Sequence, residues 1–215
     1  EGRPGRRTII RSINAIIAQL ARFRRPAARL LQPGLSRQRI GELEAALPFR
    51  LSPELVTLYR HRNGTAAKEG DALEDLHFFP GFYWLSLEDA IEAFRQQRSR
   101  QWKQDWFPVF GDGAGDFYAA PCDPAGSTGV VGFVRGEPEQ EVEYLSLRAM
   151  FKTLAECFAQ GAFLVRGGEF TIDDQKHRRI AIRLNPGLGF WSRQDREAEE
   201  GHRRLEALQL AQQAY

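Results

Sequence analysis

Apolar residues recur at three- and four-residue steps through much of the first hundred residues, which predicts a series of amphipathic helices. The first, over residues 8–31, has arginines between its apolar positions and is expected either to break near Pro26 or to run to Pro33. Two further helices are predicted to start after Ser36 and Ser52, because a serine there accepts hydrogen bonds from the first backbone N–H groups of a helix.

Short apolar and aromatic runs bounded by Gly, Pro and Asp predict sheet strands in the middle of the chain. These runs lie at residues 78–84, 106–110, 117–120 and 130–134. Helical spacing interrupts them after Ser86 and returns in three later segments, at residues 145–161, 173–184 and 193–213, with an extended stretch possible at 163–170. The helix at 145–161 has one continuous apolar face, so it should cover one face of the sheet.

The length and composition are those of one globular domain with appendages. Of the 215 residues, 42% are hydrophobic, which suffices for a substantial core, and no uninterrupted apolar stretch approaches the length of a membrane span. Cys122 and Cys157 are 35 residues apart and fit no metal-ligand spacing, and no apolar signal-peptide core follows the basic N-terminus. We therefore expect buried thiols and a cytoplasmic location.

The charge of the chain is unevenly distributed. Residues 1–39 hold ten arginines and one acid, a net charge of +9, whereas residues 40–215 hold 20 basic and 27 acidic residues, a net charge of −7. The basic helix could pack against the domain, bind a partner, or contact a membrane surface or nucleic acid. Because basic and aromatic residues are not interleaved in the rest of the chain, a dedicated nucleic-acid-binding module is not expected.

The run Gly111-Asp112-Gly113-Ala114-Gly115-Asp116 is rich in glycine but does not have the pattern of a phosphate-binding loop. It has no GK[ST] sequence, and two carboxylates would repel phosphate. It also departs from a calcium loop, because Ala114 has no side-chain oxygen to act as a ligand and Phe117 stands where that loop needs glycine. The alternative is a tight turn in which Asp112 and Asp116 cap backbone N–H groups and can also face a cationic partner.

The sequence offers no catalytic constellation. Its four histidines are scattered, no Ser or Cys has the setting of an activated nucleophile, and carboxylate pairs lie at helix starts where the helix dipole accounts for them. We therefore predict no enzymatic activity and no catalytic, cofactor-binding or metal-binding residue.

Acidic clusters are the candidate binding residues, because they could attract a basic partner such as a nuclease-like protein and speed its association. The alternative is that they are simply solvated loops. The candidates lie in a loop, in the glycine-rich turn and in a second loop, and are Glu69, Asp71, Glu74, Asp75, Asp112, Asp116, Glu137, Glu139 and Glu141.

Several segments together resemble the SUKH superfamily, which includes Smi- and Knr-like cell-wall regulators of fungi and many bacterial immunity proteins. The resemblance covers about residues 34–191. The order and spacing of four pieces carry it: the predicted helix pair at 34–64, the helix start Leu85-Ser86-Leu87-Glu88-Asp89-Ala90, the segment from Trp106-Phe107-Pro108 through Gly115-Asp116-Phe117, and Asp123-Pro124 before a Gly-Val strand.

The resemblance implies an α+β fold with a mixed, mainly antiparallel sheet flanked by helices, to which this chain adds a basic N-terminal helix and C-terminal helices. The expected division is an extension at 1–33, the SUKH-like domain at 34–191 and a helical tail at 192–215. The implied function is stoichiometric neutralisation of a cognate bacterial toxin or effector, for example from a polymorphic toxin system or type VI secretion. The alternative is a regulatory scaffold that binds endogenous partners.

Overall fold

The computed structural model describes residues 4–66 and 71–213. The helices in this part of the chain are α1 Pro4–Arg22, α2 Ala27–Leu30, α3 Arg37–Glu44, α4 Pro53–His61, α5 Leu73–Leu76, α6 Leu87–Gln96, α7 Leu147–Ala159, α8 Asp174–Leu184 and α9 Gly189–Gln213. The strands are β1 Leu31–Pro33, β2 Arg62–Thr65, β3 His77–Phe79, β4 Phe82–Trp84, β5 Trp106–Gly111, β6 Phe117–Pro121, β7 Val130–Phe133, β8 Glu141–Tyr144, β9 Phe163–Arg166 and β10 Glu169–Ile172.

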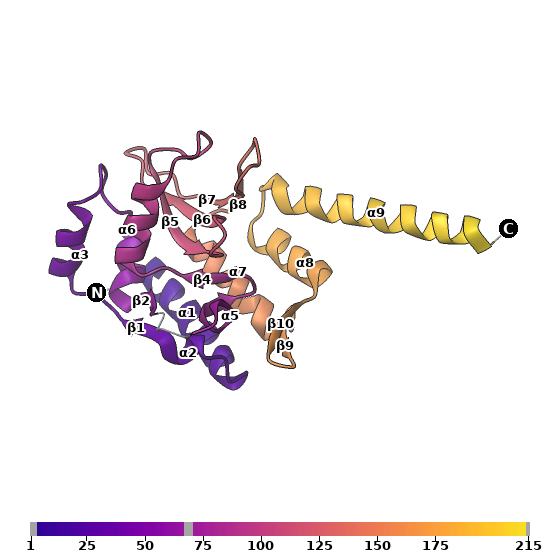
Figure 1. Ribbon diagram of the computed structural model, residues 1–215, viewed down its shortest axis with the longest axis horizontal. Helices are drawn as coiled ribbons and strands as arrows, with labels where there is room; N and C mark the ends of the chain where they lie inside the picture. Colours follow the sequence, from indigo (N-terminus) through magenta and orange to yellow (C-terminus); the bar gives the residue numbers. More distant parts are fainter. Residues whose placement is uncertain (1–3, 67–70, 214–215) are drawn as a thin grey trace.

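A six-stranded sheet forms the centre of the molecule and runs in the order β3-β4-β5-β6-β7-β8, with every neighbouring pair antiparallel (Figure 1). Two smaller antiparallel pairs, β1-β2 and β9-β10, lie outside it. The expected α+β class is confirmed. Strands β6 and β7 form an antiparallel hairpin, whose register pairs Ala119 with Val131.

Helix α7 covers one face of this sheet, as its apolar face predicts. The ring of Phe151 lies 5.7 Å from the rings of both Trp84 and Phe110 and 6.2 Å from that of Phe78, so one helical side chain contacts three strands. All four side chains are fully buried. Burial of such rings contributes most of the stability of a core of this size.

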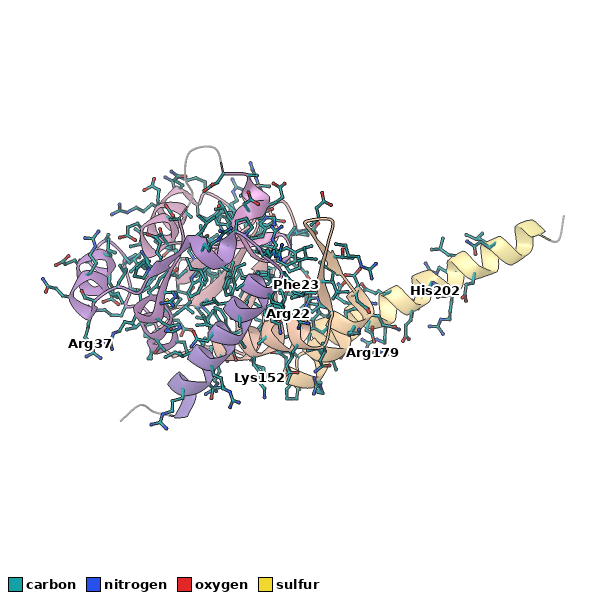
Figure 2. The ribbon with its side chains drawn as sticks, turned by 90° about the horizontal axis from the view of Figure 1, so that it is seen from below. Arg22, Phe23, Arg37, Lys152, Arg179 and His202 are labelled. Atoms are coloured by element: carbon teal, nitrogen blue, oxygen red, sulfur yellow. The ribbon has the colours of Figure 1, made fainter. Side chains whose placement is uncertain are left out.

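The basic helix α1 packs on α7 and belongs to the same core. Ile9, Ile13, Ile16 and Leu20 are each at most 2% exposed and line the buried face of α1. Arg7, Arg11 and Arg22 of the same helix are exposed. Figure 2 shows α1 beside the segment of α7 that carries Lys152. Of the three roles considered for this helix, packing against the domain is therefore confirmed.

The opposite face of the sheet carries a smaller aromatic cluster. Trp106, Phe133 and Phe117 contact Trp102, whose ring lies 5.0 Å from Phe133 and 5.9 Å from Trp106. The loop between α6 and β5 thus covers this face with one tryptophan.

The serine caps predicted from sequence are confirmed. The Ser36, Ser52 and Ser86 hydroxyls accept hydrogen bonds from the N–H groups three residues on, and the first helix breaks just before Pro26. Three boundaries differ from the expectation. Helix α4 ends at His61 and not near residue 64, because the next residues pair with β1 as strand β2. A short helix, α5, lies in the segment before residue 76 that was expected to be a loop. Helix α9 begins at Gly189 and not at residue 193.

A further difference concerns the acidic segment at residues 137–143, which was expected to be a loop, either simply solvated or facing a basic partner. Its end forms strand β8, in which Glu143 is 8% and Tyr144 1% exposed. The alternation of Glu141, Val142, Glu143 and Tyr144 is a strand pattern, but the four acidic residues of the segment conceal it.

Removing a buried side chain of α1 should destabilise the whole fold. We expect Ile13→Ala to lower the free energy of unfolding by about 2–5 kcal/mol, because it leaves a cavity against α7. Urea denaturation followed by circular dichroism measures this, with exposed Arg11→Ala as the control. Equal stability of the two variants would mean that α1 is a separable appendage.

Candidate functional site

Three acidic segments meet at one end of the six-stranded sheet. Because neighbouring strands are antiparallel, the β5–β6 and β7–β8 connections lie at the same end, and the β6–β7 connection lies at the other. Helix α5, which precedes β3 in the chain, lies beside the β5–β6 connection. We call this surface the acidic end, defined by Asp71, Glu74, Asp75, Asp112, Asp116, Glu137 and Glu139.

The β5–β6 turn is held by Asp112. Its Oδ1 atom accepts hydrogen bonds from the backbone N–H groups of Ala114, Gly115 and Asp116 at 2.8, 2.9 and 2.9 Å. Gly113 and Gly115 have positive φ values of 85° and 115°, which glycine adopts readily and other residues rarely do. The expected tight turn with Asp capping is confirmed, and the turn is rigidly organised by one carboxylate.

A second carboxylate joins this turn to the neighbouring β7–β8 connection. Asp116 Oδ1 accepts a hydrogen bond of 2.8 Å from the backbone N–H of Arg135. A Cβ atom on Gly115 would lie 3.0 Å from Cδ of Arg135, so the side chain of this arginine lies against the turn. Gln140 closes the connection itself: its side-chain amide accepts a hydrogen bond from the Val134 N–H and donates one to the Val134 carbonyl.

Helix α5 packs on the same turn from the other side. A Cβ atom on Gly113 would lie 2.8 Å from Cδ2 of Leu73, which places this leucine directly on the glycine. Burial lowers the pKa of His77, while the nearby carboxylates of Glu74 and Asp112 act in the opposite direction. The first two predicted clusters are therefore adjacent, although some 40 residues separate them in sequence.

The acidic end combines negative charge with exposed apolar surface. Residues 71–76, 112–116 and 134–140 together contain seven acidic residues and one basic residue, Arg135. Leu73 and Val134 are 39% and 42% exposed among these acids. Apolar anchors bordered by charge are typical of surfaces that bind proteins.

Two of the predicted binding residues are left out of the definition of this surface. Glu69 lies outside the described residues. Glu141 is in strand β8 and forms an ion pair with Arg193 at the base of α9, so its charge is already compensated within the chain.

Arg25 ties α5 to the rest of the fold. Its guanidinium donates hydrogen bonds to the backbone oxygens of Glu74 and Gly168 and lies 4.9 Å from the ring centre of Phe170. The side chain is 6% exposed. At least one arginine of the basic N-terminal segment thus positions the acidic end instead of binding a partner.

Strand β8 carries a buried carboxylate, that of Glu143, in a segment expected to be a loop. Glu143 Oε2 accepts a hydrogen bond of 2.9 Å from the Tyr118 hydroxyl, and the Glu143 carbonyl accepts one of 2.6 Å from Trp191 Nε1. Gly132 makes room, because a Cβ atom there would lie 1.9 Å from Glu143 Oε1. Burial raises the pKa of Glu143 to about 7.

The other end of the sheet carries a groove of about 860 Å³ between the residues before α4, the β6–β7 connection and the start of α7. Its lining is mainly apolar and includes Leu51, Ala120, Cys122 and Leu147. Both cysteines are buried and unpaired, as expected, and burial raises the pKa of Cys122 to about 11. The thiol at this groove is therefore protonated at neutral pH and is a poor nucleophile.

In the part of the chain that the structure describes, no three His, Cys, Asp or Glu side chains are grouped as metal ligands would be. No helix among residues 4–66 and 71–213 is long and apolar enough to cross a membrane.

Comparison with known proteins identifies the family. The profile of the SMI1 / KNR4 family (SUKH-1) matches residues 34–156, more than half of the chain. The chain belongs to this family, whose members are often immunity proteins. No curated protein gives a significant match.

The family match contains the Asp112 turn, α5 and the β7–β8 connection, so the acidic end lies within the shared domain. It excludes α1, α2, β1, β9, β10, α8 and α9. The division of the chain at residues 33 and 191 stays a prediction.

The buried Glu143 should make stability depend on pH. Its pKa is higher in the folded state than the ordinary value of 4.5, so the folded chain holds this proton more tightly than the unfolded chain. Its contribution to stability is therefore full below about pH 4.5 and is lost as pH rises toward 7. We expect Glu143→Gln to be more stable than wild type at pH 8, by on the order of 3 kcal/mol, with little gain at pH 4.5.

Urea titrations at the two pH values test this, with the exposed Glu139→Gln as a control for the loss of one negative charge. If Glu143→Gln and wild type show the same change in stability with pH, the carboxylate does not titrate in this range.

Proposed function

We propose that this chain is an immunity protein that binds a cognate toxin stoichiometrically through its acidic end. The observation that carries the proposal is the meeting of three acidic segments, distant in sequence, on one surface of a SUKH-1 domain. Family membership supports the immunity role. The partner is a bacterial toxin or effector whose contact surface is basic, such as a nuclease-like domain, and binding takes place in the cytoplasm.

The form of the acidic end suits rapid and specific binding. The three segments carry seven carboxylates and one guanidinium of their own, that of Arg135, and this excess creates a negative field that attracts a basic protein and competes with nucleic acid for its cationic surface. The turn backbone is already ordered by Asp112 and Asp116, so little conformational entropy is lost on association. Leu73 and Val134 supply apolar contact that retains the partner after the charges have attracted it.

Neutralisation of this kind needs affinity and no chemistry. A partner held on the acidic end is inhibited when the bound surface overlaps its active site or blocks an essential motion. No step requires a metal, a cofactor or a nucleophile from this chain.

Co-expression with the product of the adjacent gene tests the proposal. We expect the neighbouring protein to be toxic alone, and growth to be rescued together with co-purification of a complex when this chain is present. Toxicity with both proteins soluble, but without rescue or a complex, would contradict immunity and favour a regulatory scaffold with endogenous partners.

Charge reversal tests the acidic end itself. In a double variant Glu137→Lys/Glu139→Lys, we expect association with the partner at low ionic strength to be at least about tenfold slower and less dependent on salt. The control Glu92→Lys/Glu199→Lys changes the same charge on exposed residues of α6 and α9. Stopped-flow association rates measure both, and equal rates for the two double variants would contradict steering by this surface.

A further inference from the structure

Helix α9 leaves the body of the protein after its first two turns. Its base is fixed by an ion pair of 3.0 Å between Arg178 and Asp195 and by the hydrogen bond of Trp191 to the Glu143 carbonyl. The remainder projects away from every other element in both views (Figures 1 and 2), and His202 lies well outside the body.

The projecting part has an apolar stripe without a partner among the residues that the structure describes. Leu205 and Leu208 are 61% and 60% exposed, the highest values among the large hydrophobic side chains that the structure describes. Ala198 and Gly201 precede them at the same three- and four-residue spacing, so the four residues form one stripe along the helix. An isolated helix in water gains little stability without packing of such a face.

The charges on this part are segregated along the helix axis. Residues 195–200 contain four acids and one arginine, of which Asp195 pairs with Arg178 of α8. Residues 202–204 are His, Arg and Arg, and they are followed by one acid, Glu206, which pairs with His202. A parallel pair of these helices would place like charges together. An antiparallel pair places the acidic segment of each helix against the basic segment of the other.

We propose that α9 pairs with α9 of a second copy of this chain, antiparallel and through the stripe of Ala198, Gly201, Leu205 and Leu208. The small Ala198 and Gly201 lie at the crossing point and allow the two backbones to approach closely. Glu197 and Arg204 are seven residues apart, so both border the stripe on the same side. Glu197 of each copy pairs with Arg204 of the other. The paired segment is short, so the dimer is weak and depends on concentration.

Sedimentation equilibrium of the full chain tests the pairing. We expect the average mass to rise from 24.5 kDa toward twice that value between micromolar and near-millimolar concentrations. The variant Leu205→Ala/Leu208→Ala keeps good helix formers and should stay at the monomer mass. The control Arg196→Ala lies on the opposite side of the helix and should behave as wild type. A wild type that stays monomeric throughout overturns the proposal, as does self-association unchanged by the leucine substitutions.

Charge swapping tests the antiparallel orientation. We expect Glu197→Lys and Arg204→Glu each to weaken self-association at least severalfold, because each places like charges opposite one another. An equimolar mixture of the two variants should form a heterodimer, in which opposite charges face again.

The matched controls are Glu199→Lys and Arg203→Glu, which make the same changes of charge on the face away from the stripe. They should self-associate as wild type does, and circular dichroism verifies that all variants keep α9 helical. If the mixture associates no better than the separate variants, or if the controls weaken association equally, the antiparallel interface is wrong.

Discussion

The contact between α7 and the face of the six-stranded sheet that it covers is the interaction on which the rest of the molecule depends. Phe151 of α7 touches aromatic rings from three strands, and α1 packs on the other side of α7. The core therefore extends from the basic N-terminal helix to the middle of the sheet as one unit. Because this core fixes the strands, it also fixes the ends at which their connections emerge.

The acidic end follows from that arrangement together with two aspartates. Asp112 uses one oxygen to hold three backbone N–H groups, and Asp116 reaches across to the next connection. Charge-assisted bonds of this kind are stronger than those between neutral groups. A surface of like charges would repel itself in a mobile loop, but here hydrogen bonds and the packing of Leu73 on Gly113 keep the segments together. The preorganised backbone is what distinguishes this surface from a set of solvated acidic loops.

Local order was largely predictable from the sequence, because serine caps, glycine turns and apolar spacing act over a few residues. Ser36, Ser52 and Ser86 predicted three helix starts, and Asp112 predicted a capped turn. The proximity of Leu73 to Gly113 was not predictable, since it depends on how α5 meets the sheet about 40 residues later in the chain. Glu143 was misjudged because its neighbours are acidic, and only strand pairing shows that its side chain points inward beside Tyr118.

Hydrogen–deuterium exchange of the chain, alone and in complex with the toxin partner that we propose, tests the central claim most directly. The account predicts that binding slows exchange at residues 71–76, 112–116 and 134–140 together, and leaves the groove at the opposite end of the sheet unchanged. Protection confined to the groove residues around Leu51 and Cys122, with none at the acidic end, would contradict it.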